Sequence, residues 1–141
     1  MTTTHGSTRS HGINRHSRQL VDAMCALVVT DLVGGLLAVA AEVNTWAEAW
    51  WTEALLAAPV PMIVVQVVLA LAAVTSARWF AALAAGLLAL ACLVSVVSGF
   101  FDGGLGNDAL TPALSAYQVF LLVVTAVVGV LAARRMVEIL R

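Results

Sequence analysis

The chain carries four long runs of apolar residues, separated by short polar segments. They cover Leu20–Ala41, Leu56–Ser76, Trp79–Phe100 and Leu114–Ala133. A transmembrane α-helix needs about 20 mostly apolar residues, and none of the runs shows the strict alternation of a β-barrel strand. Because the connections are short, neighbouring helices are expected to be antiparallel. The pattern therefore predicts an all-α, polytopic membrane protein, built as an up-and-down bundle of four transmembrane helices.

The composition excludes an ordinary soluble domain. Of the 141 residues, 62% are hydrophobic and 11% are charged, whereas soluble domains have about 45–50% apolar and about 25% charged residues. A single core of this size cannot bury so much apolar surface. A net charge of −1, with no basic patch away from the chain ends, also argues against nucleic acid as a partner. The expected partner is the lipid bilayer.

The basic residues predict how the helices are oriented. The chain has no Lys, and its seven basic residues all fall on one side of the four predicted helices, as Arg9, Arg15, Arg18, Arg78, Arg134, Arg135 and Arg141. The opposite loops hold acids instead, namely Glu48, Glu53, Asp102 and Asp108. Since positively charged loops stay in the cytoplasm, both termini are expected to be cytoplasmic. The lack of Lys and the abundance of Ala and Val favour a bacterial source, and hence the inner cell membrane.

The chain is expected to divide into three parts. Residues 1–19 are rich in Ser, Thr, Gly, Arg and His, which predicts a disordered basic cytoplasmic tail. Residues 20–133 form the transmembrane domain, and residues 134–141 form a cytoplasmic C-terminal end. The tail histidines, His5, His11 and His16, lack the regular spacing and the Cys partners of a zinc site, so neither a metal nor a cofactor is expected.

One alternative changes the number of helices. Ala38-Val39-Ala40 has the A-x-A pattern of a signal-peptide cleavage site, and cleavage after it leaves three helices. Asp31 interrupts the apolar run that a signal peptide needs, which favours the uncleaved chain.

The polar connections contain two helix-start signals and a set of aromatic anchors. Thr45 and Glu48 have the spacing of a capping box, and Thr111-Pro112 is typical of an N-cap followed by Pro at the first helical position. Three indole rings are expected to anchor the first outer loop at the lipid headgroups, from Trp46, Trp50 and Trp51. The Gly-rich loop Asp102–Asp108 lacks the ligand order of a calcium site and is interpreted as a turn.

One charged residue lies deep inside a predicted helix. Asp31 is about eleven residues into the first helix, where a charge costs about 2.5–3.5 kcal/mol, and intramembrane acids are usually functional or paired. Its cationic partner is missing, because Arg78 is roughly 18 Å away along the helix axis. Without a cation, Asp31 is expected to be neutral at rest.

Other polar residues are expected to gather around Asp31 in one intramembrane cluster. They are Gln66, Ser95, Ser98, Gln118 and Thr125. Small residues that allow close helix approach are expected to form the packing faces, and these are Gly34, Gly35, Ala38 and Gly129. The alternative is that Gln, Ser and Thr act only as hydrogen-bonding links between helices.

Three function classes are compatible with this set. The favoured hypothesis is a non-enzymatic accessory or assembly subunit, which binds a membrane-protein partner or a second copy through its small-residue faces. The alternative is a small transporter in which Asp31 couples a proton to a cationic or polar small molecule held in the bundle. The third is a membrane enzyme that acts on a lipid or terpenoid, and it lacks a recognisable catalytic partner for Asp31.

Overall fold

The computed structural model describes residues 15–51, 56–101 and 110–141. Several expectations fall outside these ranges: those for His5, Arg9, His11, Glu53 and the loop Asp102–Asp108. Within the ranges the chain is helical, with short turns and extended connections and no β-strand.

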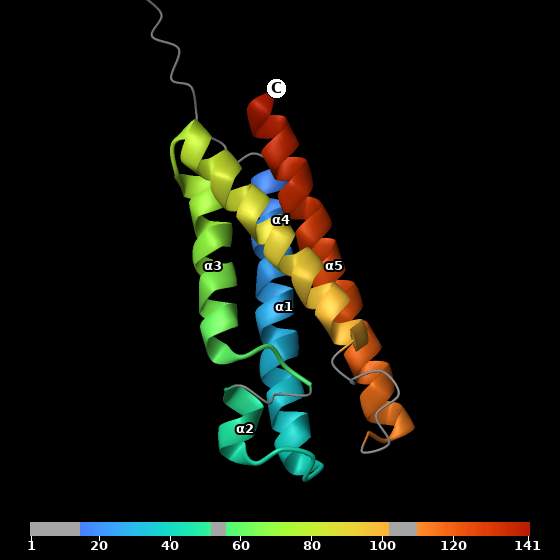
Figure 1. The fold of residues 1–141 in the computed structure, drawn as a ribbon. Coiled ribbons are helices and arrows are strands. Elements are labelled where there is room, and N and C mark those ends of the chain that lie inside the picture. Colours follow the sequence, from blue (N-terminus) through green and yellow to red (C-terminus); the bar gives the residue numbers. More distant parts are fainter. Residues whose placement is uncertain (1–14, 52–55, 102–109) are drawn as a thin grey trace, which may run out of the picture.

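Four long helices and one short helix make up the described part of the chain (Figure 1). They are α1 (Arg15–Ala40), α2 (Trp46–Trp50), α3 (Val60–Thr75), α4 (Arg78–Phe101) and α5 (Pro112–Leu140). Three of them, α1, α4 and α5, are long and apolar enough to cross a membrane. The predicted all-helical membrane protein is confirmed at this level. The predicted count of four is not, because the 16 residues of α3 extend only about 24 Å, short of the roughly 30 Å hydrocarbon core.

Two helices are longer than their apolar runs predict. α1 begins at Arg15, inside the predicted tail, and Ser17 and Leu20 are buried there, so packing extends the helix beyond the apolar run. α5 continues to Leu140, through the predicted C-terminal end.

The second predicted helix is shorter than expected because of proline. It begins at Val60, four residues after Leu56, and Pro59 occupies its N-cap position. A residue that precedes proline is disfavoured in the helical conformation, which prevents the helix from starting earlier. In Figure 1, α3 begins part-way up the molecule and runs toward the top of the view, and α2 lies below its first residues, beside α1.

α4 and α5 pack against each other in antiparallel directions along their lengths (Figure 1). Glycines permit this close approach. A Cβ built at Gly86 lies 2.9 Å from Met136 Sδ, and one built at Gly129 lies 2.9 Å from the Cβ of Cys92. Since membrane helices associate by van der Waals packing, small residues at these contacts stabilise the pair.

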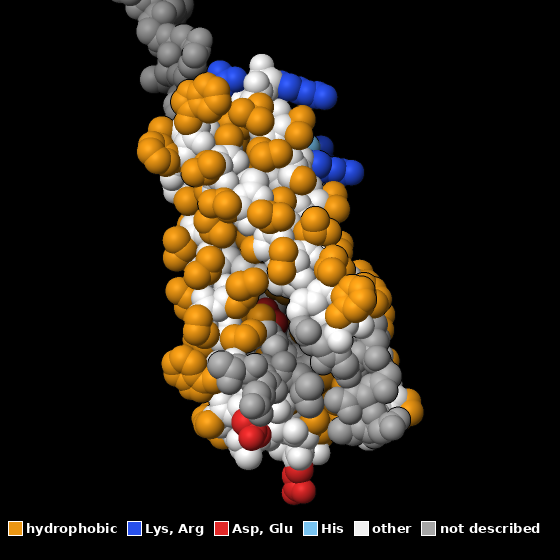
Figure 2. All heavy atoms as spheres, viewed as in Figure 1, with side chains coloured by type: hydrophobic (Ala, Val, Ile, Leu, Met, Phe, Trp, Pro, Cys, Tyr) orange, Lys and Arg blue, Asp and Glu red, His pale blue; other side chains and the backbone are white. Residues whose placement is uncertain are grey.

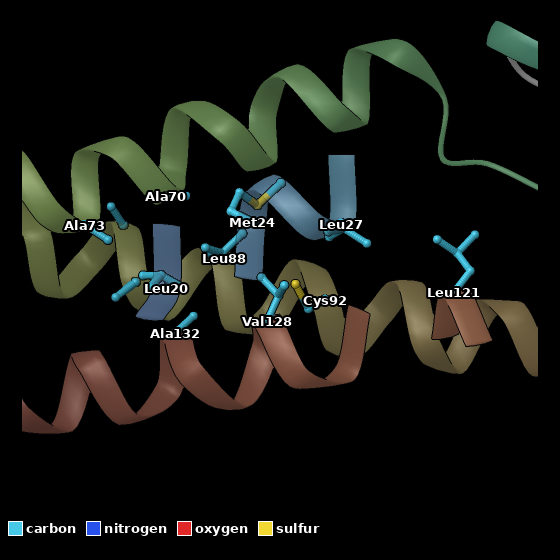
Figure 3. Close-up of a cluster of buried hydrophobic side chains, with 12 residues drawn as sticks. Leu20, Met24, Leu27, Ala70, Ala73, Leu88, Cys92, Leu121, Val128 and Ala132 are labelled. Carbon is cyan, nitrogen blue, oxygen red and sulfur yellow. The ribbon is translucent and has the colours of Figure 1, made fainter. Parts of the chain in front are cut away.

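The main apolar cluster joins all four long helices (Figure 3). Its labelled members include Leu20 and Leu27 of α1, Ala73 of α3, Leu88 of α4 and Val128 of α5. A second, smaller cluster of Ala38, Leu56 and Leu110 lies nearer the α2 end. In α1, the residues of the main cluster precede Asp31, and Ala38 of the smaller cluster follows it.

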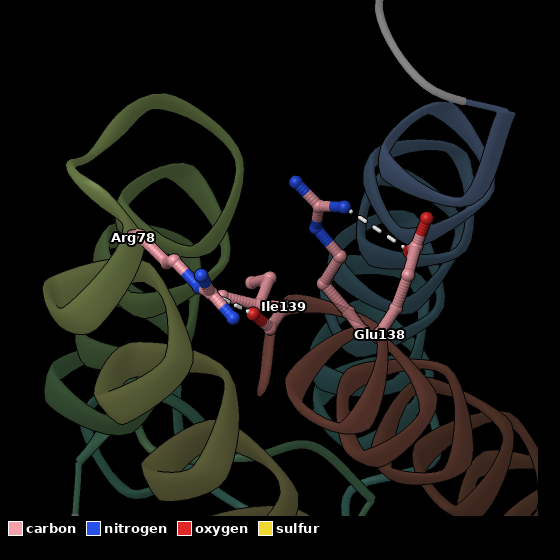
Figure 4. Close-up of polar contacts among 4 residues, drawn as sticks. Arg78, Glu138 and Ile139 are labelled. Atoms are coloured by element: carbon pink, nitrogen blue, oxygen red, sulfur yellow. Dashed lines mark hydrogen bonds and ion pairs between the residues drawn. The ribbon is translucent and has the colours of Figure 1, made fainter. Parts of the chain in front are cut away.

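Charge is strongly asymmetric along the bundle. On the face seen in Figure 2, the Arg side chains lie at one end and acidic side chains lie mainly at the other. At the Arg end, the Arg78 guanidinium donates from Nε to the Ile139 carbonyl oxygen at 2.8 Å (Figure 4). It also donates from Nη2 to the Leu140 carbonyl oxygen at 3.3 Å. The last carbonyls of a helix lack partners within the helix, so Arg78 of α4 caps α5. Arg135 also pairs with Glu138 at 3.1 Å.

The connection after α1 turns the chain back toward the bundle. Glu42 has a left-handed backbone with φ 55°, its N–H donates to Val39 O, and the N–H of Val43 donates to Ala38 O at 3.0 Å. This is the Schellman arrangement that ends many helices. It directs the following residues into α2.

Both predicted helix starts are confirmed. At α2, the Thr45 N–H donates to Glu48 Oε2 at 2.7 Å and the Glu48 N–H donates to Thr45 Oγ1 at 3.4 Å, which completes a capping box. At α5, Thr111 Oγ1 accepts the N–H of Leu114, and Pro112 opens the helix.

Two adjacent glycines of α1 hold the α2 region against the bundle. A Cβ built at Gly34 lies 1.8 Å from the carbonyl oxygen of Leu56, and one built at Gly35 lies 2.8 Å from Cη2 of the Trp50 ring. The backbone of Leu56 and the Trp50 ring therefore occupy the space that side chains at these two positions need.

Gly34→Ala is expected to destabilise the protein by about 1–3 kcal/mol, because the methyl group meets backbone rather than a flexible side chain. Gly86→Ala is the matched control. Its methyl group meets only the end of Met136, so the gain in helix propensity, up to about 1 kcal/mol, can be realised. Unfolding midpoints in detergent, followed by circular dichroism, measure both, and equal effects of the two substitutions contradict the prediction.

The capping box of α2 is expected to weaken in acid. Hydrogen bonds from the backbone and side chain of Thr45 lower the pKa of Glu48 below its ordinary 4.5. A carboxyl with a lowered pKa stabilises the fold when ionised, so its contribution is present at neutral pH and is lost as the pH falls through the lowered value. The hydrogen-exchange protection factor of the Thr45 amide should fall in this range. In Glu48→Gln it should not change with pH.

Candidate functional site

Asp31 is the buried acid of the described chain, with 1% of its surface exposed. It lies 16 residues from the start of α1 and nine from its end, or roughly 24 Å and 14 Å along the axis. It is therefore nearer to the α2 end of the helix than to its Arg15 end. Its Oδ1 accepts the backbone N–H of Ala58 at 2.9 Å.

The partner of Asp31 is thus a peptide group and not a cation. Ala58 lies in the extended entry to α3, where Pro59 and Pro61 have no N–H to donate. The N–H groups of Met62 and Ile63 both donate to Pro59 O, at 2.8 and 3.1 Å. The sequence removes two donors from this entry, and Asp31 accepts the donor that Ala58 retains.

The second oxygen of the carboxyl has no partner. Asp31 Oδ2 is buried, and it accepts no hydrogen bond from any described residue. A buried acceptor without a donor costs about 1–3 kcal/mol. A proton, or a ligand that donates a hydrogen bond, satisfies such an atom without disturbing the bond that Oδ1 makes to Ala58.

Tyr117 of α5 is the site residue that the sequence analysis missed. Its hydroxyl donates to the carbonyl oxygen of Thr30, the residue before Asp31 in α1. A Cβ built at Gly34 lies 3.0 Å from the Tyr117 ring. The ring therefore packs where Gly34 leaves room, beside the acid. Tyr117 directly precedes the predicted cluster residue Gln118 and therefore lies about 100° from it around α5.

The other polar residues of the predicted cluster are buried to different degrees. Gln66 and Gln118 are buried, and the Oε1 atom of each lacks a hydrogen-bond partner among the residues described. Thr125 is also buried, but its hydroxyl donates to Leu121 O in its own helix. Ser95 and Ser98 of α4 are only half-buried.

A difference in depth explains why Asp31 is not hydrogen-bonded to Gln66. Asp31 is level with Ala58, just before α3, whereas Gln66 lies six residues after the start of α3, or roughly 9 Å further toward the Arg end. Asp31 and Gln66 are expected at one depth if the second helix begins at Leu56. Because α3 begins at Val60, the two residues lie at different depths.

The structure places the predicted anchors and packing residues as follows. Trp46 and Trp51 are 63% and 60% exposed, as expected of rings at a membrane interface. Trp50 differs, because its ring packs at Gly35, in edge-on contact with Trp46, and its Nε1 is buried without a partner in the described chain. A second set consists of small residues that pack within the chain itself: Gly34, Gly35, Ala38 and Gly129.

A hollow reaches into this region from the side. Figure 2 shows it about half-way along the bundle, with an acidic side chain at its base and apolar side chains around the part of its rim that is described. The ribbon in the same view shows α1 behind this point, between α3 and α5. Within the described ranges, no three His, Cys, Asp or Glu residues are grouped to hold a metal ion.

Comparison of the chain with protein-family models, curated proteins and solved structures found no match.

Asp31→Ala is expected to destabilise the protein by about 1–3 kcal/mol, because it leaves the Ala58 N–H buried without an acceptor. Asp31→Asn keeps an oxygen at the same place and should remain within about 1 kcal/mol of the wild type. Unfolding midpoints and the exchange rate of the Ala58 amide measure the difference. Equal destabilisation by the two substitutions contradicts the role of this hydrogen bond.

Proposed function

We propose that the chain crosses the membrane four times, with both termini in the cytoplasm. In the fourth crossing, α3, about 24 Å long, is preceded by the non-helical residues Leu56–Pro59, which bend at Leu56 and Ala57. Backbone without helical hydrogen bonds is tolerated at membrane depth only inside protein, and Leu56 and Ala57 are buried. The Arg residues at one end of the bundle support the orientation through the positive-inside rule.

We propose further that the protein is a small proton-linked carrier for a cationic or polar molecule, with Asp31 as its binding group. The observation that carries this proposal is that the two oxygens of the Asp31 carboxyl have different surroundings. Oδ1 accepts the Ala58 N–H, while Oδ2 is buried and has no hydrogen-bond partner among the described residues. Because Oδ1 accepts that hydrogen bond whether the acid is protonated or ionised, the fold is compatible with both states.

Exchange at this site follows from elementary charge balance. A protonated Asp31 is neutral and stable in an apolar interior, whereas an ionised one needs a positive partner. Arrival of a cation at Oδ2 with loss of the proton keeps the site neutral. Tyr117 of α5 packs beside this part of α1, with its ring against Gly34 and its hydroxyl engaged with Thr30 O. The orphaned Oε1 atoms of Gln66 and Gln118 offer further acceptors elsewhere in the bundle.

The accessory-subunit hypothesis has less support from the geometry. The small residues that suggested a docking face contact Leu56, Trp50 and Cys92 of the same chain. A partner protein therefore needs another surface.

A lipid-soluble carbodiimide, which reacts with protonated carboxyl groups, should label Asp31 in proteoliposomes, and the labelling should decrease as the pH rises. Mass spectrometry of peptides locates the adduct. With an outward-directed gradient of tetramethylammonium, the wild type should also move protons inward, and Asp31→Asn should reduce this flux to that of empty liposomes.

Two controls separate the carrier from a sealed structural carboxyl. Asp22, which is exposed on α1, provides a reference for labelling by a water-soluble carbodiimide. Asp22→Asn should leave the proton flux unchanged. A folded protein in which Asp31 resists labelling at every pH contradicts the proposal.

A further inference from the structure

Three oxygen atoms without hydrogen-bond partners lie inside the bundle, one on each of three helices. They are Asp31 Oδ2, Gln66 Oε1 and Gln118 Oε1, and none of them accepts a hydrogen bond from a residue that the structure describes. Asp31, Gln66 and Gln118 are 1%, 1% and 7% exposed. When Asp31 is ionised, all three atoms only accept hydrogen bonds, so they cannot satisfy one another. A group that donates several hydrogen bonds satisfies them.

Asp31 lies between the two glutamines along the bundle. Gln66, six residues after the start of α3, is roughly 9 Å nearer to the Arg end. Gln118 is on the other side, because it follows Tyr117, whose ring packs at Gly34, almost one turn beyond Asp31 toward α2. In each of the three chain segments, the residue lies between the main apolar cluster and the smaller one. The three acceptors therefore form a polar layer with apolar packing on both sides.

The balance of acceptors and donors in this layer favours a cation. Among the described residues of this region, Trp50 Nε1 is the buried donor that lacks a partner. Its ring packs at Gly35, one turn from Asp31 on the α2 side. Unpartnered acceptors thus outnumber unpartnered donors, and one of the acceptors belongs to an acid.

The chemistry of the layer fits a primary ammonium. Such a group carries three N–H donors, as the end of a Lys side chain does, and it meets three acceptors here. Ca²⁺ and Mg²⁺ take six or more oxygen ligands, and a quaternary ammonium has the charge but no N–H. Apolar side chains surround the described part of the rim of the hollow (Figure 2), so an apolar substituent on the nitrogen suits the way in.

We infer that the site selects a primary ammonium with an apolar substituent, which donates to Asp31 Oδ2 and to the Oε1 atoms of Gln66 and Gln118. This inference rests on the proposed function, because it names the class of cation that the carrier binds. It assigns a new role to the two glutamines. Because each Gln side chain has three rotatable bonds, its amide can turn toward a cation at Asp31, and the two amides distinguish N–H donors from cations of equal charge without them.

Two isomeric cations test this selectivity. tert-Butylammonium and tetramethylammonium have the same charge and nearly the same size, and only the first donates hydrogen bonds. Isothermal titration calorimetry of the full chain in non-ionic detergent should give a dissociation constant about tenfold lower, or less, for tert-butylammonium, since a hydrogen bond that involves a charged group contributes a factor of this size or more. Asp31→Asn should abolish the binding of both cations, and binding that survives this substitution contradicts the inference.

The role of the glutamines has its own variants. Gln118→Met and Gln66→Met keep the length of the side chain and remove the oxygen, and each should reduce the preference for tert-butylammonium about fivefold. Both variants should fold, because the substitution removes a buried acceptor that has no partner. Gln19→Met, the same change at an exposed position of α1, should retain the full preference.

The outcomes separate this inference from the proposed function. Equal affinities of the wild type for the two cations, both lost in Asp31→Asn, overturn the inference and leave the carrier proposal standing. A preference that is unchanged in both Gln118→Met and Gln66→Met also overturns the inference. Binding of neither cation by the folded wild type overturns the inference and the carrier proposal together.

Discussion

The interior of a bilayer offers no water to satisfy a peptide group, and the hydrogen bond between Ala58 and Asp31 answers this constraint. α3 is too short to cross the hydrocarbon core alone, and in the proposed fourth crossing the non-helical segment before it brings N–H groups that need acceptors. Two prolines remove donors from this segment, and the carboxyl of α1 accepts another. Asp31, a residue that is costly in an apolar helix, thus makes the non-helical segment before α3 compatible with an apolar environment.

The same face of α1 combines this polar contact with close packing. Asp31, Gly34, Gly35 and Ala38 follow one another at helical spacing, and all four are buried. The glycines admit the Leu56 backbone and the Trp50 ring, and the Tyr117 ring closes against Gly34 from α5. The segments around Asp31 can approach α1 closely because Gly34 and Gly35 have no side chains. Within the described ranges, the second oxygen of the Asp31 carboxyl accepts no hydrogen bond.

Sequence reasoning recovered what depends on local rules and missed what depends on tertiary contacts. The long helices, the capping box at Thr45 and the cap at Thr111 follow from hydropathy and short-range spacing, and the structure has them. The predicted start of α3 is wrong because hydropathy does not distinguish helical from non-helical chain. Pro59 and Pro61 are the residues that indicate a later start. The sequence offers Asp31 no side-chain cation as a partner, and its partner is a backbone amide 27 residues away. Nothing in the spacing of α5 singles out Tyr117.

The short α3 has a consequence for the biogenesis of the protein. An isolated segment beginning near Leu56 exposes unsatisfied amides if it enters lipid before its acceptor is present, and a 16-residue helix lacks the length to partition stably by itself. In the proposed four-crossing arrangement, this segment is stable in lipid only when α1 already presents its carboxyl at the matching depth. That arrangement then requires α1 and α3 to enter the bilayer together as a helical hairpin, with α1 in place first.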